Sequence, residues 1–238
     1  MFSQLLSDIG SLWAKYGTVY LTGIANTLIL AVTATLIGCI IGFLCGILQT
    51  IPYNSNDNII KRFFLKLIRI IIRIYVEVFR GTPMILQAVF IYYGLPKLGF
   101  SVTPRLCGIA GLAFLGGSYM AEAFRSGLES VPVIQSESAL SLGMSSSQMI
   151  RYVILPQALS TSIPALLANV IFLLKETSVF SAVSLMDLMF TAKDLIGLYY
   201  NTTEALFLLV VMYLIILLPI SMVGMLLERR LRYAGFGD

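Results

Sequence analysis

The sequence predicts an all-α membrane protein with about five transmembrane helices and one short cytoplasmic helix. Charged residues make up 12% of the chain and mean hydropathy is +0.90. Soluble proteins carry about 25% charged residues, so an ordinary soluble domain is excluded. No charge occurs between Lys15 and Asp57, or from Ala205 to Leu227, and a bilayer crossing requires roughly 20 apolar residues. The length of 238 residues fits a single transmembrane domain, 1–238.

Five stretches are long and apolar enough to be expected as spans. They cover roughly residues 19–48, 70–97, 106–124, 154–174 and 204–227. Within the first stretch, Gly38, Gly42 and Gly46 lie four residues apart on one helical face. Such a stripe of small residues lets another helix approach closely. Packing within the chain is favoured over a seam between two copies.

A charged stripe with helical spacing leads into the second span. Its members are Arg62, Lys66, Arg69, Arg73, Glu77 and Arg80. The first two are expected to extend to lipid headgroups, while Glu77 and Arg80 lie deeper and are expected to face a protein interior. Gly81-Thr82-Pro83 is expected to interrupt or kink the helix, because proline removes a backbone donor.

The distribution of Lys and Arg predicts the orientation of the chain. If the N-terminus is outside, eleven of the sixteen cations are cytoplasmic. They fall between Lys61 and Arg80, at Arg125, at Arg151 and between Arg229 and Arg232. Because cytoplasmic loops carry an excess of Lys and Arg, we expect the N-terminus out and the C-terminus in.

A polar insert at residues 133–148 interrupts this apolar chain on the predicted cytoplasmic side. Val131-Pro132 ends the preceding helix, since the residue before proline disfavours helical geometry. A helix can run from Val133 to Leu142, and Gly143 stands where a left-handed cap is needed. Ser145 with Gln148 forms a capping box for the next helix. The insert is predicted to be helix, glycine break and helix.

Three motifs give the chain a resemblance to a known family. Glu137, Ser138, Ala139, Gly143, Leu155 and Pro156 follow the spacing of the Glu-Ala-Ala loop in membrane subunits of bacterial ABC importers. The segments Phe79–Pro83 and Lys175–Ser178 narrow the resemblance to the polar amino acid permeases, similar to histidine and glutamine permeases. The likeness extends from about Leu21 to Gly235.

The resemblance implies a multi-pass permease subunit of an ATP-driven importer in the bacterial cell membrane. Glu137 to Gly143 would be the coupling segment that docks on cytosolic ABC ATPase subunits. An extracytoplasmic amino acid-binding protein would deliver a polar amino acid. Since one chain supplies half a pathway, the partner would be a second permease copy or a homologous permease.

Substrate contacts are expected from polar residues at membrane depth. A zwitterion needs opposite charges or helix-end dipoles to replace its water. Asn169, Glu176, Thr177 and Ser178 offer partners for an ammonium group, and Arg80 for a carboxylate. A structural ion pair between Arg80 and Glu77 is an equal alternative, and an interfacial Lys175–Glu176 pair explains Glu176 nearly as well.

Several chemistries are not expected. The chain has no Gly-Lys dipeptide, so it lacks a Walker A loop and is not predicted to be an enzyme. It has no histidine and no clustered acids and cysteines, so no metal or cofactor is expected. Its basic residues follow the membrane boundary and indicate lipid contact, not nucleic acid. A self-contained secondary transporter or channel using Glu77, Arg80, Glu122 and Glu176 is the alternative, although five spans without an internal repeat are few for one.

Overall fold

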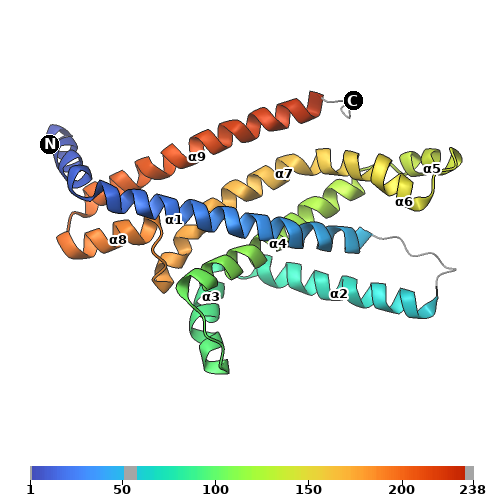
Figure 1. The fold of residues 1–238 in the computed structure, drawn as a ribbon, viewed down its shortest axis with the longest axis horizontal. Helices are drawn as coiled ribbons and strands as arrows, with labels where there is room; N and C mark the ends of the chain where they lie inside the picture. The colour runs from blue at the N-terminus through green and yellow to red at the C-terminus, as the bar shows by residue number, and fades with distance from the viewer. Residues whose placement is uncertain (1, 51–57, 234–238) are drawn as a thin grey trace. The chain divides into compact units, whose positions relative to one another are not determined.

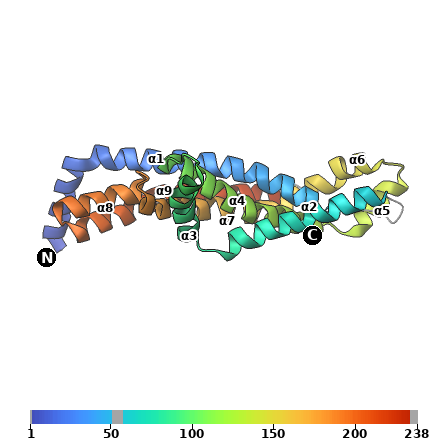
Figure 2. The same cartoon turned by 90° about the horizontal axis from the view of Figure 1, so that it is seen from below.

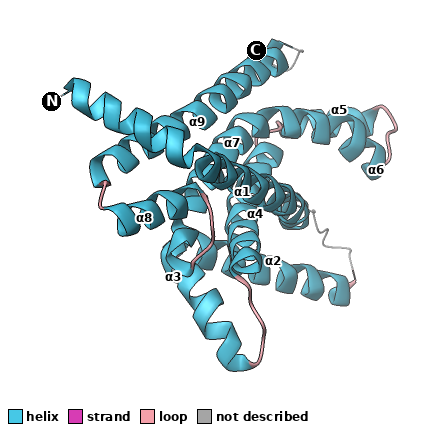
Figure 3. Cartoon of the chain, turned by 60° about the vertical axis from the view of Figure 1, so that its left-hand side comes forward, coloured by secondary structure: helices cyan, strands magenta, loops and turns pink. Residues whose placement is uncertain are grey.

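Each long apolar stretch of the sequence forms a helix in the computed structural model, which describes residues 2–50 and 58–233. Figure 3 shows helices and loops, and no strand occurs in these two ranges. The α-helices are α1 (Phe2–Thr50), α2 (Ile59–Gly81), α3 (Met84–Val89), α4 (Pro104–Glu129), α5 (Val133–Ser141), α6 (Ser146–Met149), α7 (Leu155–Glu176), α8 (Leu188–Tyr199) and α9 (Thr202–Tyr233), labelled in Figure 1. The predicted all-α class is confirmed.

Four helical stretches are long and apolar enough to cross a membrane. They are Ser7–Thr50, Pro104–Glu129, Ser146–Val183 and Thr202–Arg230. The second predicted span is divided in the structure. Helix α2 ends at Gly81, Thr82 adopts an extended conformation, and a shorter apolar stretch follows at Met84–Leu98. The helix is therefore interrupted at the glycine–threonine–proline segment, as proline chemistry predicts, and the exact span limits stay a prediction.

Contacts along the chain define two compact units. Unit 1 comprises residues 1–34, 83–112 and 171–222, and unit 2 comprises residues 35–82, 113–170 and 223–238. Each unit is built from three separate stretches of sequence, and α1, α4, α7 and α9 each contribute to both. The assignment of the whole chain to one transmembrane domain stays a prediction.

In unit 2, the glycine face of α1 lies directly on α4. A Cβ atom at Gly42 would lie 2.5 Å from Met120 Cβ and 2.8 Å from the Ala121 nitrogen. A Cβ atom at Gly38 would lie 3.1 Å from the Gly117 nitrogen, and one at Gly46 would lie 2.7 Å from Phe124 Cβ. Buried side chains of α2 pack beside this contact, and the Tyr75 hydroxyl donates a 2.6 Å hydrogen bond to the Phe114 carbonyl. The predicted packing of the glycine stripe within the chain is confirmed.

Unit 1 has its own apolar core, to which α1, α8 and α9 contribute. Tyr20, Leu188, Ala192 and Ala205 are completely buried there. The start of α8 is fixed by polar contacts as well. The backbone N–H of Leu188 donates to the Thr27 hydroxyl at 3.0 Å, so a helix-end donor is satisfied inside an apolar core.

The close contact between α1 and α4 predicts opposite effects for two glycine-to-alanine substitutions on one helix. We expect Gly42→Ala to lower the free energy of unfolding by about 1–3 kcal/mol, because the added methyl group meets α4 backbone. Gly10→Ala, with nothing within 4 Å of its new Cβ, is expected to be neutral or to stabilise by up to about 1 kcal/mol. Reversible unfolding of the purified chain in detergent measures both. Equal stability of the two variants would contradict this packing.

Candidate functional site

The polar insert in unit 2 folds as two short helices joined by a glycine turn. Gly143 has φ of +80°, the left-handed geometry that glycine adopts without steric cost. The Gly143 N–H donates to the Leu140 carbonyl at 2.9 Å, and the Met144 N–H to the Ala139 carbonyl at 3.2 Å. These two bonds form a Schellman motif, which satisfies the last carbonyls of α5. The predicted glycine break is confirmed.

Helix α6 begins at the capping box that its sequence predicts. The Ser145 hydroxyl accepts from the Gln148 N–H at 3.3 Å, and the Gln148 side chain accepts from the Ser145 N–H at 2.9 Å. Figures 1 and 2 show α5 and α6 lying against one another. The caps hold the two helices in a defined geometry although each is too short to be stable alone.

Apolar side chains on this insert are exposed, a feature that the motif analysis did not identify. Val133, Ile134 and Leu142 have exposed fractions of 72%, 61% and 82%. Glu137 and Ser138 are exposed as well, whereas Ala139 is only 3% exposed. Exposed apolar residues beside polar ones are typical of a surface that another protein covers. The methyl group of Ala139 is already covered by its own chain.

Leu155 and Pro156 lie at the junction between the insert and α7. The helix widens there into a π turn at Ile150–Ile154, immediately before Leu155. Pro156 has no N–H to donate to the preceding turn. One residue later, the Gln157 side chain donates to the Val153 carbonyl at 2.9 Å. Leu155 is half-buried and Pro156 exposed. The motif positions Glu137 to Pro156 thus all lie on one continuous segment of unit 2.

A second group of predicted site residues lines a polar cavity in unit 2. This cavity has a volume of about 420 Å³ and is bordered by Glu77 and Arg80 of α2 and by Glu122, Arg125 and Glu129 of α4. The Arg80 guanidinium lies 3.9 Å from the Glu122 carboxylate and 5.2 Å from the centre of the Tyr119 ring.

The structure pairs Arg80 with a residue other than the expected Glu77. The ion pair considered from the sequence is not formed, since the carboxylate within 4 Å of Arg80 belongs to Glu122. Arg125 also binds Glu122, with its Nε donating at 3.1 Å, and extends to Glu129. Glu77 and Arg80 lie three residues apart on α2, but helix–helix packing places the α4 carboxylate closer to the guanidinium.

The remaining substrate candidates divide between the two units. Asn169 is half-buried in unit 2, and Glu176, Thr177 and Ser178 are consecutive in unit 1. The Thr177 and Ser178 hydroxyls donate to the carbonyls of Leu174 and Lys175, both at 2.8 Å. Their donors are therefore used within the helix, and their oxygens are left as acceptors. Thr177 is completely buried, whereas Glu176 is half-buried.

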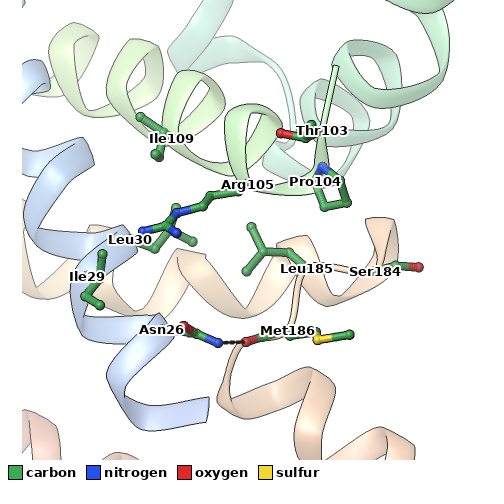
Figure 4. Close-up of a pocket in the computed structure, with 10 residues that line it drawn as sticks. All are labelled: Asn26, Ile29, Leu30, Thr103, Pro104, Arg105, Ile109, Ser184, Leu185 and Met186. Carbon is green, nitrogen blue, oxygen red and sulfur yellow. Dashed lines mark hydrogen bonds between the residues drawn. The ribbon is translucent and has the colours of Figure 1, made fainter. Parts of the chain in front are cut away.

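Unit 1 also contains a cavity that the sequence did not indicate. Its volume is about 340 Å³, and Figure 4 shows Arg105 extending into it from the start of α4. On its wall, the Asn26 side chain donates a 2.8 Å hydrogen bond to the Met186 carbonyl. Its polar lining comes from residues far apart in sequence, so no local motif marks it.

Asp187, next to this wall, is completely buried and caps helix α8. Its Oδ1 accepts from the Phe190 N–H at 2.8 Å, while Oδ2 has no hydrogen-bond partner in the described chain. Burial raises the pKa of this carboxyl to about 6. Within the described residues no group of His, Cys, Asp and Glu is arranged to hold a metal ion.

Comparisons with known proteins agree with these motifs. Residues 38–233 match the family model described as "Binding-protein-dependent transport system inner membrane component". The chain is 30% identical to the arginine transport system permease protein ArtQ of Bacillus subtilis, covering 89% of this chain and 92% of the relative. It is also 30% identical to the glutamine transport system permease protein GlnP of Escherichia coli K12, covering 94% and 98%. These relatives are transport permease subunits and are not enzymes themselves.

Solved structures share the fold. The crystal structure of an amino acid ABC transporter with histidines has a TM-score of 0.81 at 32% identity, covering 91% of this chain and 96% of that one. An inward-facing MetNI methionine ABC transporter has a TM-score of 0.74 at 22% identity, which shows the fold alone. The secondary transporter or channel is not favoured. The chain belongs to the family of inner membrane components of binding-protein-dependent transport systems, the permease subunits of ABC importers.

Proposed function

We propose that this permease moves polar amino acids into the cell, driven by cytosolic ABC ATPase subunits and supplied by an extracytoplasmic binding protein. The observation that supports it most is similarity over nearly the whole chain to permeases named for arginine and glutamine transport. The segments Arg80–Pro83 and Lys175–Ser178 lie within this similarity. The octopine permease OccM of Rhizobium radiobacter, 32% identical, extends the list to another polar amino acid derivative.

Coupling to ATP hydrolysis is assigned to α5, Gly143 and α6. The exposed Val133, Ile134 and Leu142 supply apolar area for docking, and Glu137 supplies a polar or ionic contact. Leu155 and Pro156 connect this surface to α7, so a displacement of the insert is passed directly to a long apolar helix. ATP hydrolysis itself belongs to the separate subunit, because this chain has no Walker A sequence.

Candidate substrate contacts are proposed within each unit separately. Glu176 and the hydroxyl oxygens of Ser178 and Thr177 offer acceptors for an ammonium group, and Asn169 offers both a donor and an acceptor. Arg80 is held by Glu122 and Tyr119, so it meets a substrate carboxylate only by sharing those partners. The N-terminus is placed outside and the C-terminus inside, and the permease pairs with a second copy or a homologous permease.

The left-handed turn at Gly143 gives the most direct test of coupling. A residue other than glycine there costs about 1–2 kcal/mol, which lowers the population of this turn by roughly 5–30-fold. We expect Gly143→Val to reduce ATP-driven uptake in proteoliposomes by about tenfold while the protein still inserts. Gly99→Val is the matched control, since Gly99 has φ of +89° and equally open surroundings in unit 1. Its uptake should stay near the wild-type rate.

A second substitution at Gly143 separates the effect of backbone strain from the effect of side-chain size. Asparagine tolerates the left-handed region, so Gly143→Asn keeps the turn and adds a side chain. Loss of uptake in this variant as well would assign the defect to close approach by the ATPase. Normal uptake in Gly143→Val would count against the proposed coupling surface.

The substrate site is tested by removing one negative charge in unit 1. We expect Glu176→Gln to weaken amino acid uptake by about ten- to a hundredfold, because a hydrogen bond to a charged group contributes about 1.5–3 kcal/mol. Substrate-stimulated ATP hydrolysis in reconstituted transporter should fall with it. Glu204→Gln, in the first turn of α9, removes the same charge from unit 1 and should change neither rate. Unchanged transport in Glu176→Gln would show that this carboxylate does not contact substrate, and transport of sugars or metal ions alone would overturn the substrate class.

A further inference from the structure

The polar cavity of unit 2 carries an excess of positive charge. Three further basic side chains of α2 line it in addition to the residues described above, and they are Lys66, Arg69 and Arg73. The cavity wall then holds five cations and three carboxylates. The spacing of three and four residues places these three cations on one helical face.

The carboxylates of α4 are already bound by arginines. Glu122 accepts hydrogen bonds from Arg125 and lies within ion-pair distance of Arg80, and Glu129 is bound by Arg125. These four residues balance one another in charge. Only Glu77 then remains to oppose the three cations nearer the start of α2.

Lys66 and Arg73 form no hydrogen bond or ion pair with any residue in the described ranges. Both side chains are exposed, and neither lies within 4 Å of a carboxylate there. An arginine presents several donors in a fixed fork that matches a phosphate group, and a lysine adds a compact positive charge. Lys66 and Arg73 together have more N–H donors than the Glu77 carboxylate can accept hydrogen bonds from.

A further part of the α2 surface is apolar and exposed. Phe63, Phe64, Ile71 and Ile74 have exposed fractions of 56–63%. Such an apolar face suits contact with acyl chains, which would place the cavity beside a lipid-facing surface. A ligand with a phosphate group and hydrocarbon chains fits both features at once, whereas a free anion uses only the cations.

We propose that this cavity binds the headgroup phosphate of an anionic membrane lipid. The phosphate lies between Lys66 and Arg73, with Arg69 at the back of the cavity, and the acyl chains run along the apolar face of α2. The ion pairs of Arg125 and Arg80 keep the α4 carboxylates from repelling the phosphate. Such a lipid anchors α2 to the bilayer immediately before the break at Gly81.

Lipid binding to the purified full-length chain tests the proposal. The chain in detergent is titrated with phosphatidylglycerol or phosphatidylcholine, and bound lipid is counted by native mass spectrometry. Each cation near an anionic headgroup contributes about fivefold in affinity, so Lys66→Gln with Arg73→Gln should weaken phosphatidylglycerol binding by about 30-fold. Phosphatidylcholine should bind at least about tenfold more weakly than phosphatidylglycerol to the wild type.

The control removes two positive charges from unit 2 outside the cavity, at the exposed end of α9. Arg229→Gln with Arg230→Gln should change phosphatidylglycerol binding less than about threefold, and Arg73→Lys, which keeps the charge, should retain most of it. Equal weakening by the two double variants would overturn the proposal, because it would show general charge attraction. Displacement of the lipid by millimolar inorganic phosphate would overturn the lipid assignment and identify a free-anion site.

Discussion

The cost of an unpaired backbone group in hydrocarbon governs where this chain departs from a helix. An N–H or C=O without a partner costs several kcal/mol there, so the chain leaves the helix only where other groups replace the lost bonds. One break lies at Gly81–Pro83, next to the second predicted span, and two more lie at Pro132 and Gly143 in the exposed insert, where water can also satisfy backbone groups. At Gly143 the turn itself satisfies the last carbonyls of α5. Two of these breaks, Gly81–Pro83 and Gly143, carry motifs that mark the family.

Ionised side chains inside the helix bundle need a partner for the same reason as backbone groups do. An ionised side chain within an apolar bundle is retained only with a partner, and Arg125 binds carboxylates one helical turn away on either side. Arg80 crosses from α2 to join this group at Glu122. These ion pairs therefore link α2, which ends at Gly81, to α4, which leads into the insert at residues 133–148. All of these ion pairs lie within unit 2, among residues of α2 and α4.

Local sequence rules predicted the local features well. The Gly143 turn, the Ser145–Gln148 capping box and the break at Gly81 depend on residues within a few positions of each other, and each was read from sequence. The α1 glycine stripe predicted close helix packing, although the sequence could not identify α4 as its partner. The motif resemblance identified the family because three segments occur in order at fixed spacing.

Features that depend on which helices meet were not predictable in the same way. Arg80 pairs with Glu122, not with its helical neighbour Glu77, because tertiary packing brings α4 closer. The unit 1 cavity joins Asn26, Arg105 and Met186, which share no motif. Ala139 belongs to the segment expected to dock on the ATPase but is buried, since its position on α5 faces its own chain. Asn169 belongs to unit 2 and Glu176 to unit 1, and their contact with a substrate stays a proposal.

The central claim is that the exposed insert between α4 and α7 is the surface on which the ATPase docks. A single cysteine at Leu142, which is 82% exposed, reports on it directly once Cys39, Cys45 and Cys107 have been replaced. The measurement is the rate of maleimide labelling with and without the cognate ATPase subunits. Docking on α5 and α6 predicts that labelling slows by at least about tenfold when the ATPase is present, because contact at an interface core excludes solvent. An unchanged labelling rate in a complex that still hydrolyses ATP would contradict this account.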